Sequence, residues 1–524
     1  MDGAAEARRA PVTHASRVGP DRRRVLRALG LGATGIGLGG LGALTACSSD
    51  DGTGPRADGP STTRRNGTTT TTRVVPPYDP DRPYWVQGNF APVTTEETIT
   101  NLRVRGTLPR GLSGLYVRNG SNAAHGEPLH WFLGDGMIHG VRIERGRASW
   151  YRNRYVRTPL LASGKDLLEM GAPPGKANNQ SNVALVHHAG KLLTLGEVGW
   201  PYEVRTDTLD TVGPWDFDGK LGDTMTAHPK VDPDTGRLHF FGYDILQPRL
   251  TYYEADRDGQ IDVVTPLGVD RATMVHDFAI TDREAVFWIG PVVFGADATN
   301  PDPRIPFHWD PTGPSRVGVL PFGGGPDAIR WVDIPPCFVF HGMNAHRDGD
   351  DIVLHVHRLD QAFGPEGDLT QPALTTWRIG TAGPALTFEA RQLSDRPMDL
   401  PTHDRRHTGR PTRWGWCATV TDPGAEYGFE LAGIARVDLT TGASEAWEPG
   451  QDRRAGEGLF VPDPDGRDEG DGWVLAYVWD RTTDRSSLGV FDAHAVRRGP
   501  VAWVDLPVRV PFGFHGVWVD AADL

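Results

Sequence analysis

One short pattern recurs at four widely separated points in the sequence: a histidine that leads, directly or through a polar turn, into an apolar or alternating run. The pattern is clearest at His341, where residues 338–340 are apolar, Gly342 follows, and the turn at 348–350 opens a second alternating run. The same setting surrounds His228, His276 and His515. Short alternating runs between turn residues predict β-strands. We therefore predict that these four histidines share one metal site, and that the rest of the chain is the scaffold that gathers them.

The composition is typical of an all-β protein. The chain has 524 residues with 65 Gly and 43 Pro, and it has almost no long helical periodicity. Turn signals recur beside short apolar runs from about residue 77 to residue 524, with no second linker. At ~40–60 residues for each blade, this length predicts a β-propeller of about seven blades, with a large β-sandwich as the alternative. Equivalent positions on different blades meet at a propeller's axis, which would bring histidines this far apart in the sequence together.

Charge and cysteine content exclude other classes of protein. A net charge of −13 argues against a nucleic-acid partner. Cys47, Cys337 and Cys417 are the only cysteines. Their wide spacing excludes both a CxxC-type zinc or iron–sulfur site and a disulfide framework.

The N-terminal segment has the features of an export signal. Arg22–Arg24 supply a twin-arginine core, and residues 29–46 are apolar and uncharged. The segment ends in Leu44–Cys47, which resembles the lipobox of bacterial lipoproteins. A transmembrane anchor is the alternative for the apolar run. We expect Cys47 to carry a lipid, because acyl chains there would hold the protein firmly on a membrane.

The sequence therefore predicts three parts. Residues 1–47 are a twin-arginine lipoprotein signal peptide, residues 48–76 are a disordered Ser/Thr/Gly linker, and residues 77–524 are one propeller domain. With the signal removed, the exported protein would be anchored on the outer face of the bacterial cytoplasmic membrane.

Four imidazoles make a neutral donor set. Fe²⁺ would keep its full charge in such a site, and an octahedral iron would keep open positions for O₂ and substrate. Zinc is usually closed by four protein ligands, which suits a structural site, and calcium prefers oxygen ligands, which disfavours a lactonase-like propeller. Ligating histidines also need a partner on the second ring nitrogen. Candidate carboxylates in apolar surroundings, each with an ordinary surface or hairpin carboxylate as the alternative, are Glu197, Asp399 and Glu457.

Several segments resemble the carotenoid cleavage oxygenase family. The most recognisable is His130–Gly140, and two others lie at 88–93 and 111–120. The histidine segments resemble family motifs as well, at 226–230, 275–278, 340–345 and 511–516. The likeness extends in the right order from about residue 84 to residue 524.

This resemblance implies a seven-bladed β-propeller with Fe²⁺ on its central axis. It assigns the iron ligands and the carboxylates behind them to His228, His276, His341 and His515, and to Glu197, Asp399 and Glu457. Two positions depart from the family pattern. Asp399 replaces a glutamate and is one methylene shorter, which leaves a direct or a water-bridged contact open. Val183 stands where many members have a threonine near the open iron position, so that hydroxyl is missing.

The implied reaction is cleavage of a carbon–carbon double bond by O₂ to give two carbonyl products. The expected substrate is an apolar polyene or aromatic alkene: a carotenoid, an apocarotenoid or a stilbene-like compound. The protein is expected to be a monomer. A polyene isomerase and a non-catalytic polyene-binding lipoprotein are the alternatives. An insertion with Trp and Phe at 294–322 either caps the entrance to the site or is an exposed loop.

Overall fold

Strands make up nearly all of the regular structure of the protein. The structure, a computed structural model, describes residues 75–165, 177–294, 307–364, 369–421 and 430–524. Within these ranges it contains 33 strands, and the only α-helix there is the short α2 (Pro159–Ser163). No helix of the described ranges is long and apolar enough to span a membrane. The prediction of an all-β fold is confirmed, whereas the predicted signal peptide and Cys47 lie outside the described residues.

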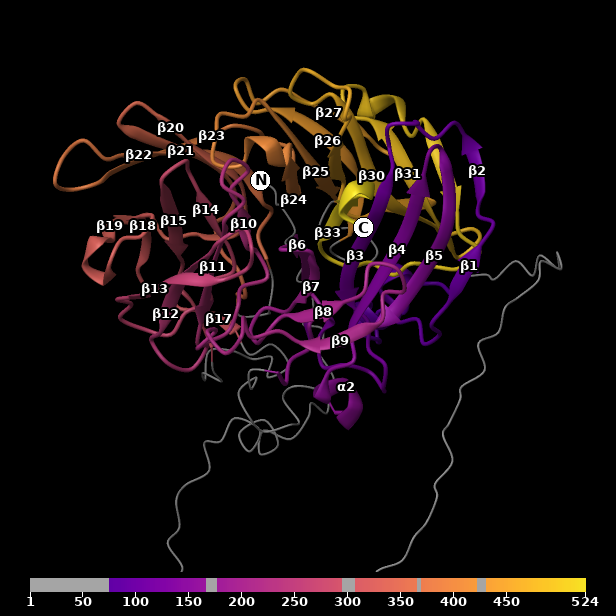
Figure 1. Ribbon diagram of the computed structural model, residues 1–524, viewed down its shortest axis with the longest axis horizontal. Helices are drawn as coiled ribbons and strands as arrows, with labels where there is room; N and C mark the ends of the chain where they lie inside the picture. The colour runs from indigo at the N-terminus through magenta and orange to yellow at the C-terminus, as the bar shows by residue number, and fades with distance from the viewer. Residues whose placement is uncertain (1–74, 166–176, 295–306, 365–368, 422–429) are drawn as a thin grey trace, which may run out of the picture.

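Seven antiparallel sheets, which we number as blades 1 to 7, form a β-propeller (Figure 1). Blade 1 has the order β1 (Thr98–Thr100), β5 (Arg147–Tyr155), β4 (Gly136–Glu144), β3 (Gly114–Ser121) and β33 (Gly516–Asp520). Blade 2 consists of β6 (Ala184–His188), β7 (Lys191–Leu195), β8 (Tyr202–Val204) and β9 (Thr211–Pro214). Blade 3 consists of β10 (Lys230–Val231), β11 (Leu238–Tyr243), β12 (Leu250–Ala255) and β13 (Ile261–Leu267).

The remaining four blades follow in chain order. Blade 4 consists of β14 (Phe278–Ile280), β15 (Glu284–Ile289), β18 (Ser315–Pro321) and β19 (Arg330–Ile334). Blade 5 consists of β20 (Phe338–Asp348), β21 (Asp351–Leu359), β22 (Ala373–Gly380) and β23 (Thr387–Gln392). Blade 6 consists of β24 (Met398–His403), β25 (Trp414–Val420), β26 (Leu431–Asp438) and β27 (Ser444–Trp447). Blade 7 has the order β2 (Arg103–Gly106), β32 (Ala502–Asp505), β31 (Arg485–Asp492), β30 (Gly472–Asp480) and β28 (Arg453–Ala455), with β29 (Leu459–Pro462) also paired to β30.

The hydrophobic core lies between neighbouring blades. Strands present alternate side chains to opposite faces, so each blade buries both of its faces against the next blade. Between blades 4 and 5, for example, Val286 and Val317 pack in one cluster with Leu354 and Trp377, and all four side chains are almost fully buried. This packing fixes the angle between blades and therefore the position of whatever lies on the axis.

Two pairings join the beginning of the chain to its end. β33, the last strand, pairs with β3 in blade 1, where Arg118 lies opposite Gly516. β2, an early strand, pairs with β32 in blade 7. Figure 1 shows the indigo and yellow strands side by side at this junction. The ring is therefore closed by strands from both ends of the folded chain.

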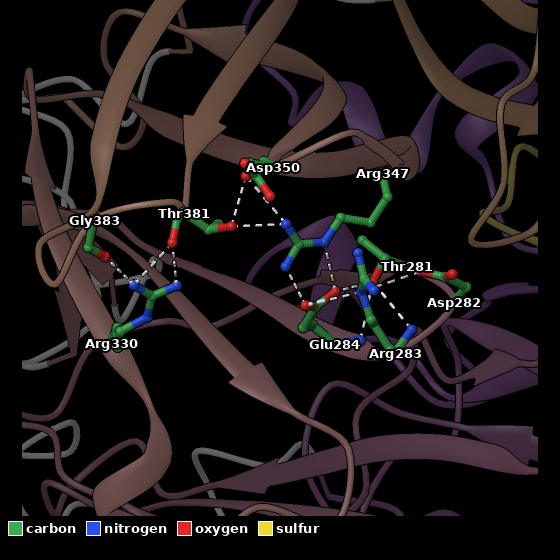
Figure 2. Close-up of polar contacts among 9 residues, drawn as sticks. All are labelled: Thr281, Asp282, Arg283, Glu284, Arg330, Arg347, Asp350, Thr381 and Gly383. Atoms are coloured by element: carbon green, nitrogen blue, oxygen red, sulfur yellow. Dashed lines mark hydrogen bonds and ion pairs between the residues drawn. The ribbon is translucent and has the colours of Figure 1, made fainter.

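A polar bridge connects blades 4 and 5 (Figure 2). Glu284 on β15 forms an ion pair with Arg347 on β20, with 3.1 Å between Arg347 Nε and Glu284 Oε2. Arg347 also donates to Thr381 Oγ1 at 2.7 Å, and Arg330 on β19 donates to the carbonyl of Gly383 at 2.8 Å. These contacts help fix two neighbouring blades whose first strands, β14 and β20, lie beside the axis.

The innermost strands of the blades face one another around the axis. β10, β14, β20, β24 and β33 each lie at one edge of their sheet. Contacts between successive inner strands link β14 to β20, β20 to β24, β24 to β29, β29 to β33 and β33 to β6. A residue at the start of such a strand is therefore held at the centre of the propeller.

The insertion predicted at 294–322 is shorter than expected. Ser315–Pro321 is β18, an integral strand of blade 4 that pairs with β15 from Arg316 to Pro321. The part outside the blade includes a separate pair of strands, β16 (Val292–Phe294) and β17 (Phe307–Trp309). The apolar residues of β18, from Val317 to Leu320, are buried in the blade.

Candidate metal centre

The four predicted histidines all lie at or near the start of inner strands. His228 comes two residues before β10, and His276 comes two residues before β14. His515 comes directly before β33. His341 differs from the prediction, because it lies inside β20 and does not precede it. The pairing of β20 with β21 shifts register on both sides of Gly342, and this irregularity sits beside His341.

The structure brings the four imidazoles into one cluster. The ring centroid of His228 lies 4.6 Å from the centroids of His276 and His515, and 5.2 Å from the centroid of His341. His341 is 5.2 Å from His276 and 4.9 Å from His515. One ring nitrogen from each of His228, His341 and His515 lies within 4.8 Å of the other two. Side chains separated by long stretches of sequence therefore meet on the axis.

Each predicted carboxylate contacts a different histidine. Nδ1 of His276 is 2.7 Å from Glu197 Oε2, which follows β7 of blade 2. Nδ1 of His341 is 2.7 Å from Asp399 Oδ1 on β24, and Nδ1 of His515 is 2.8 Å from Glu457 Oε1. The contact of Asp399 is direct, despite its shorter side chain. The three carboxylates lie where they can set the tautomers of three rings.

The donor set fits a divalent metal ion. A histidine that donates from Nδ1 to a carboxylate keeps a lone pair on Nε2. Nε2 of His341 is buried and has no hydrogen-bond partner among the described residues, and Nε2 of His228 lies 3.0 Å from Nε2 of His276. Two nitrogens that bind one ion at about 2.1 Å, at right angles to each other, are about 3 Å apart. The cluster therefore has the spacing and the free lone pairs that a shared ion requires.

The surroundings favour the neutral form of two of the four imidazoles, those of His228 and His341. Burial lowers the pKa of His228 well below its ordinary value, and the neighbouring histidines lower it further. Burial also lowers the pKa of His341, although Asp399 opposes the change. Burial alone would raise the pKa of Asp399, but His341 brings it down to about 2. In His276 the lowering by burial is outweighed by Glu197, so the pKa is raised. Neutral imidazoles are the form that binds a metal.

Sequence reasoning missed a tyrosine behind one of the carboxylates. The hydroxyl of Tyr243, at the end of β11, donates to Glu197 Oε1 at 2.6 Å. Burial, together with Glu197, raises the pKa of Tyr243 well above 10, so the hydroxyl keeps its proton. A chain of two hydrogen bonds thus leads from Tyr243 through Glu197 to His276. Tyr243 lies 46 residues from Glu197, and no local pattern in the sequence links them.

Aromatic side chains surround one side of the cluster. The ring of Phe340 meets the ring of His276 edge-on, with 5.2 Å between centroids. Phe340 belongs to a buried apolar cluster with Phe338 and Phe363. Partly buried residues packed against that cluster are Phe132, Phe307 and Trp309. The β16–β17 pair therefore lies against the apolar cluster beside the histidines, as the capping interpretation of this segment expects.

Val183 lies directly beside the histidine cluster. Its carbonyl accepts a hydrogen bond from the backbone N–H of His515 at 3.1 Å. The side chain is only partly buried and carries two methyl groups, so this position presents no hydroxyl.

The fold and the site together define a seven-bladed β-propeller with a candidate metal centre of imidazoles on its axis. The chain belongs to the carotenoid cleavage oxygenase family, because the family model described as retinal pigment epithelial membrane protein matches residues 90–520. It is accordingly an enzyme of the oxidoreductase class.

Individual relatives support this assignment over nearly the whole folded chain. A carotenoid cleavage oxygenase from Mycobacterium tuberculosis is 37% identical over 495 residues, which cover 83% of this chain and 97% of the relative. A carotenoid 9,10(9′,10′)-cleavage dioxygenase from Pisum sativum is 34% identical, covering 84% and 91%. Among solved structures, lignostilbene dioxygenase from Pseudomonas brassicacearum superimposes with a TM-score of 0.77 at 28% identity, covering 84% of this chain and 99% of that one.

Proposed function

We propose that this protein is a non-haem Fe(II) dioxygenase that cleaves a carbon–carbon double bond with O₂. In the balanced reaction, one C=C bond and the O–O bond break and two C=O bonds form. An alkene RCH=CHR′ and one O₂ therefore give the aldehydes RCHO and R′CHO. The substrate would be a carotenoid, an apocarotenoid or a stilbene-like aromatic alkene.

One observation carries the proposal: four imidazoles converge on the axis, three of them held by carboxylates. His228, His276, His341 and His515 would hold the iron. Bound Fe(II) would supply the activation of O₂ that an alkene alone cannot provide. Because all four donors are neutral, the ion would keep its full positive charge, and six-coordinate iron would retain positions for small ligands.

The protein residues would contribute positioning and a dry environment. Glu197, Asp399 and Glu457 hold three rings in one tautomer, so their Nε2 atoms stay available. The aromatic cluster that includes Phe340 would exclude water and pack against a flat, apolar substrate. No general base is needed, because the overall reaction transfers no proton to or from the protein.

The substrate class is supported by chemistry and by the relatives. Rings beside the histidines offer flat contacts to a conjugated polyene or a stilbene, which are themselves flat. The names of the relatives refer to carotenoids, to their 9,10 and 9′,10′ bonds and to lignostilbenes.

We also propose that the enzyme works at a membrane surface as a monomer. The twin-arginine segment and the lipobox-like Leu44–Cys47 support export and lipidation of Cys47. Residues 48–76 would act as a polar tether to the propeller. An anchored enzyme would lie close to the bilayer in which polyenes dissolve. Mass spectrometry of the mature protein should find an acylated Cys47 at its N-terminus, and a mature chain that retains Met1 would contradict the proposal.

The deciding experiment offers Fe(II)-loaded protein a panel of carotenoids, apocarotenals and stilbenes under ¹⁸O₂. We expect two shorter carbonyl products, both labelled, and the consumption of one O₂ for each cleaved bond. An isomerase would leave the carbon count unchanged. A non-catalytic binding protein would bind the alkene without consuming O₂.

The variant His341→Ala tests the metal site directly. We expect iron content and turnover to be lost together, because Nε2 of His341 is one of the converging donors. His494→Ala is the matched control, since His494 is on the surface and pairs with Asp471. Full iron content and turnover in His341→Ala would remove this residue from the site.

A further inference from the structure

A single buried carboxylate joins three of the four histidine segments. Asp277 is only 1% exposed. Its Oδ1 accepts hydrogen bonds from Lys230 Nζ at 2.7 Å and from the backbone N–H of Phe278 at 2.8 Å. Its Oδ2 accepts a hydrogen bond from the backbone N–H of Gly342 at 2.9 Å. The three donors belong to three different blades.

Each of these donors lies within two residues of a predicted metal ligand. Lys230 comes two residues after His228, Phe278 comes two residues after His276, and Gly342 directly follows His341. The segments are far apart in the sequence, with 65 residues between Asp277 and Gly342 and 47 between Asp277 and Lys230. Short, charge-assisted hydrogen bonds have strict geometry. The carboxylate therefore fixes the three ligand-bearing segments relative to one another.

His228 depends most on this arrangement. The other three histidines each have a carboxylate at Nδ1, but no such contact to His228 is found among the described residues. Its backbone N–H bonds to Thr226 Oγ1 at 3.1 Å, which restrains the segment on one side. On the other side, Lys230 is held by Asp277.

The fourth predicted ligand, His515, is held in a similar way by a separate carboxylate, Glu457. Glu457 contacts His515 Nδ1 through Oε1, and its Oε2 accepts a hydrogen bond from the backbone N–H of Gly516 at 2.6 Å. Glu457 thus holds both the ring and the backbone of one segment, whereas Asp277 holds the backbones of two segments and the side chain of a third.

We propose that Asp277 is a positioning residue for the metal site and that Lys230 is the partner through which it orients His228. The inference rests on the metal binding in the proposed function and adds the element that sets the spacing of His228, His276 and His341. A buried ion pair contributes little net stability on average, so its main effect here is geometric.

The variant Asp277→Asn tests this role. The amide has a single acceptor oxygen, so its NH₂ group must face either the N–H of Gly342 or the two donors Lys230 and Phe278, and at least one of the three contacts is lost. We expect the affinity for Co(II), measured on apoprotein by competition with a chelator, to fall about 10- to 100-fold. The visible absorption bands of bound Co(II) should shift as well, because the ligand geometry changes.

Glu284→Gln is the matched structural control. Glu284 is also a buried carboxylate that pairs with a basic residue and joins two blades, but its partner Arg347 lies six residues along β20 from His341. Thermal unfolding of both apoproteins should shift downward, whereas only Asp277→Asn should lose metal affinity. Equal loss of affinity in Glu284→Gln would show a general effect of weaker blade contacts and would overturn the inference.

A second variant keeps the inference testable if Asp277→Asn does not fold. Lys230→Met leaves both backbone hydrogen bonds of Asp277 and releases only the His228 segment. X-ray absorption of the Co(II) form should then count fewer imidazole ligands than in the wild type. Wild-type affinity and an unchanged ligand count in the folded variants would overturn the inference. Wild-type protein that binds metal but cleaves no alkene would instead remove the proposed dioxygenase activity alone.

Discussion

Asp399 Oδ1 lies 2.7 Å from His341 Nδ1, a direct contact made by the shorter of the two acidic side chains. The backbone explains how it reaches. The pairing of β24 with β25 shifts register just after Asp399, and Leu400 adopts a left-handed φ of 51°. The backbone N–H of Leu400 then donates to the same oxygen at 2.8 Å. An irregular strand thus brings the carboxylate to the histidine without a bridging water.

This contact predicts the effect of Asp399→Ala. The variant leaves Nδ1 of His341 without its acceptor, so the ring is free to take the other tautomer or to rotate. We expect metal affinity to fall about 10- to 100-fold in a chelator competition assay. Asp333→Ala is the control, because the Asp333 side chain is 84% exposed and far from the histidine contacts. An affinity equal to that of the control would contradict the role of Asp399.

The hydrogen bond from Tyr243 to Glu197 predicts a smaller effect for Tyr243→Phe. Loss of one hydrogen bond to a charged group costs about 1.5–3 kcal/mol, and Glu197 is partly buried. Part of that cost should appear as weaker metal binding, because Glu197 orients His276; we expect a several-fold rise in the dissociation constant. Tyr116→Phe is a matched control, since the buried hydroxyl of Tyr116 has no partner among the described residues. The prediction fails if both variants bind metal equally well.

The position of Phe340 predicts a change in substrate binding. Phe340→Leu keeps an apolar side chain but removes the ring that lies edge-on to His276. Aromatic contacts contribute about 0.5–1.5 kcal/mol beyond their buried area, so the KM for a stilbene or polyene should rise several-fold. Metal content should stay near that of the wild type. Phe388→Leu, in the outer strand of blade 5, is the control. Loss of metal with an unchanged KM would show that Phe340 supports the histidine and not the substrate.

Burial of His239 predicts acid sensitivity of the fold. Burial lowers the pKa of His239 to about 4 from an ordinary 6.5, and the ring stacks on Phe322. Below pH 6.5 the unfolded state binds a proton that the folded state does not bind. The contribution of His239 to the free energy of unfolding is therefore fully present above that pH and is lost as the pH drops towards 4. This residue alone should cost about 2 kcal/mol between pH 6.5 and pH 5.

The variant His239→Phe should remove that contribution. Urea unfolding at pH 7 and pH 5 gives the loss of stability for each protein, and the loss should be smaller in the variant by about 2 kcal/mol. Comparing the two pH values within each protein cancels the change in packing that the substitution itself causes. An identical loss in both proteins would mean that His239 does not titrate in this way.

The blades and the histidine cluster were predictable because their signals are local. Most blades are meanders whose strands and turns lie next to one another in the sequence, and each histidine lies in or close before an inner strand. The three carboxylates were also found, since each stands in an apolar setting close to a strand.

The residues that were missed make contacts without a local pattern. Asp277 directly follows His276 in the sequence, but its hydrogen bond to Gly342 spans 65 residues, and no local pattern indicates it. Tyr243 ends an ordinary strand and reaches Glu197 only through the packing of blades 2 and 3. β18 was assigned to an insertion because the sequence alone does not show with which strand it pairs.

The closure of the ring has a consequence for biosynthesis. His515 stands immediately before β33, and that strand finds its place only by pairing with β3, which the ribosome made hundreds of residues earlier. The centre can thus be completed only after the ribosome has made β33, so products of translation interrupted before that strand should never acquire oxidative chemistry.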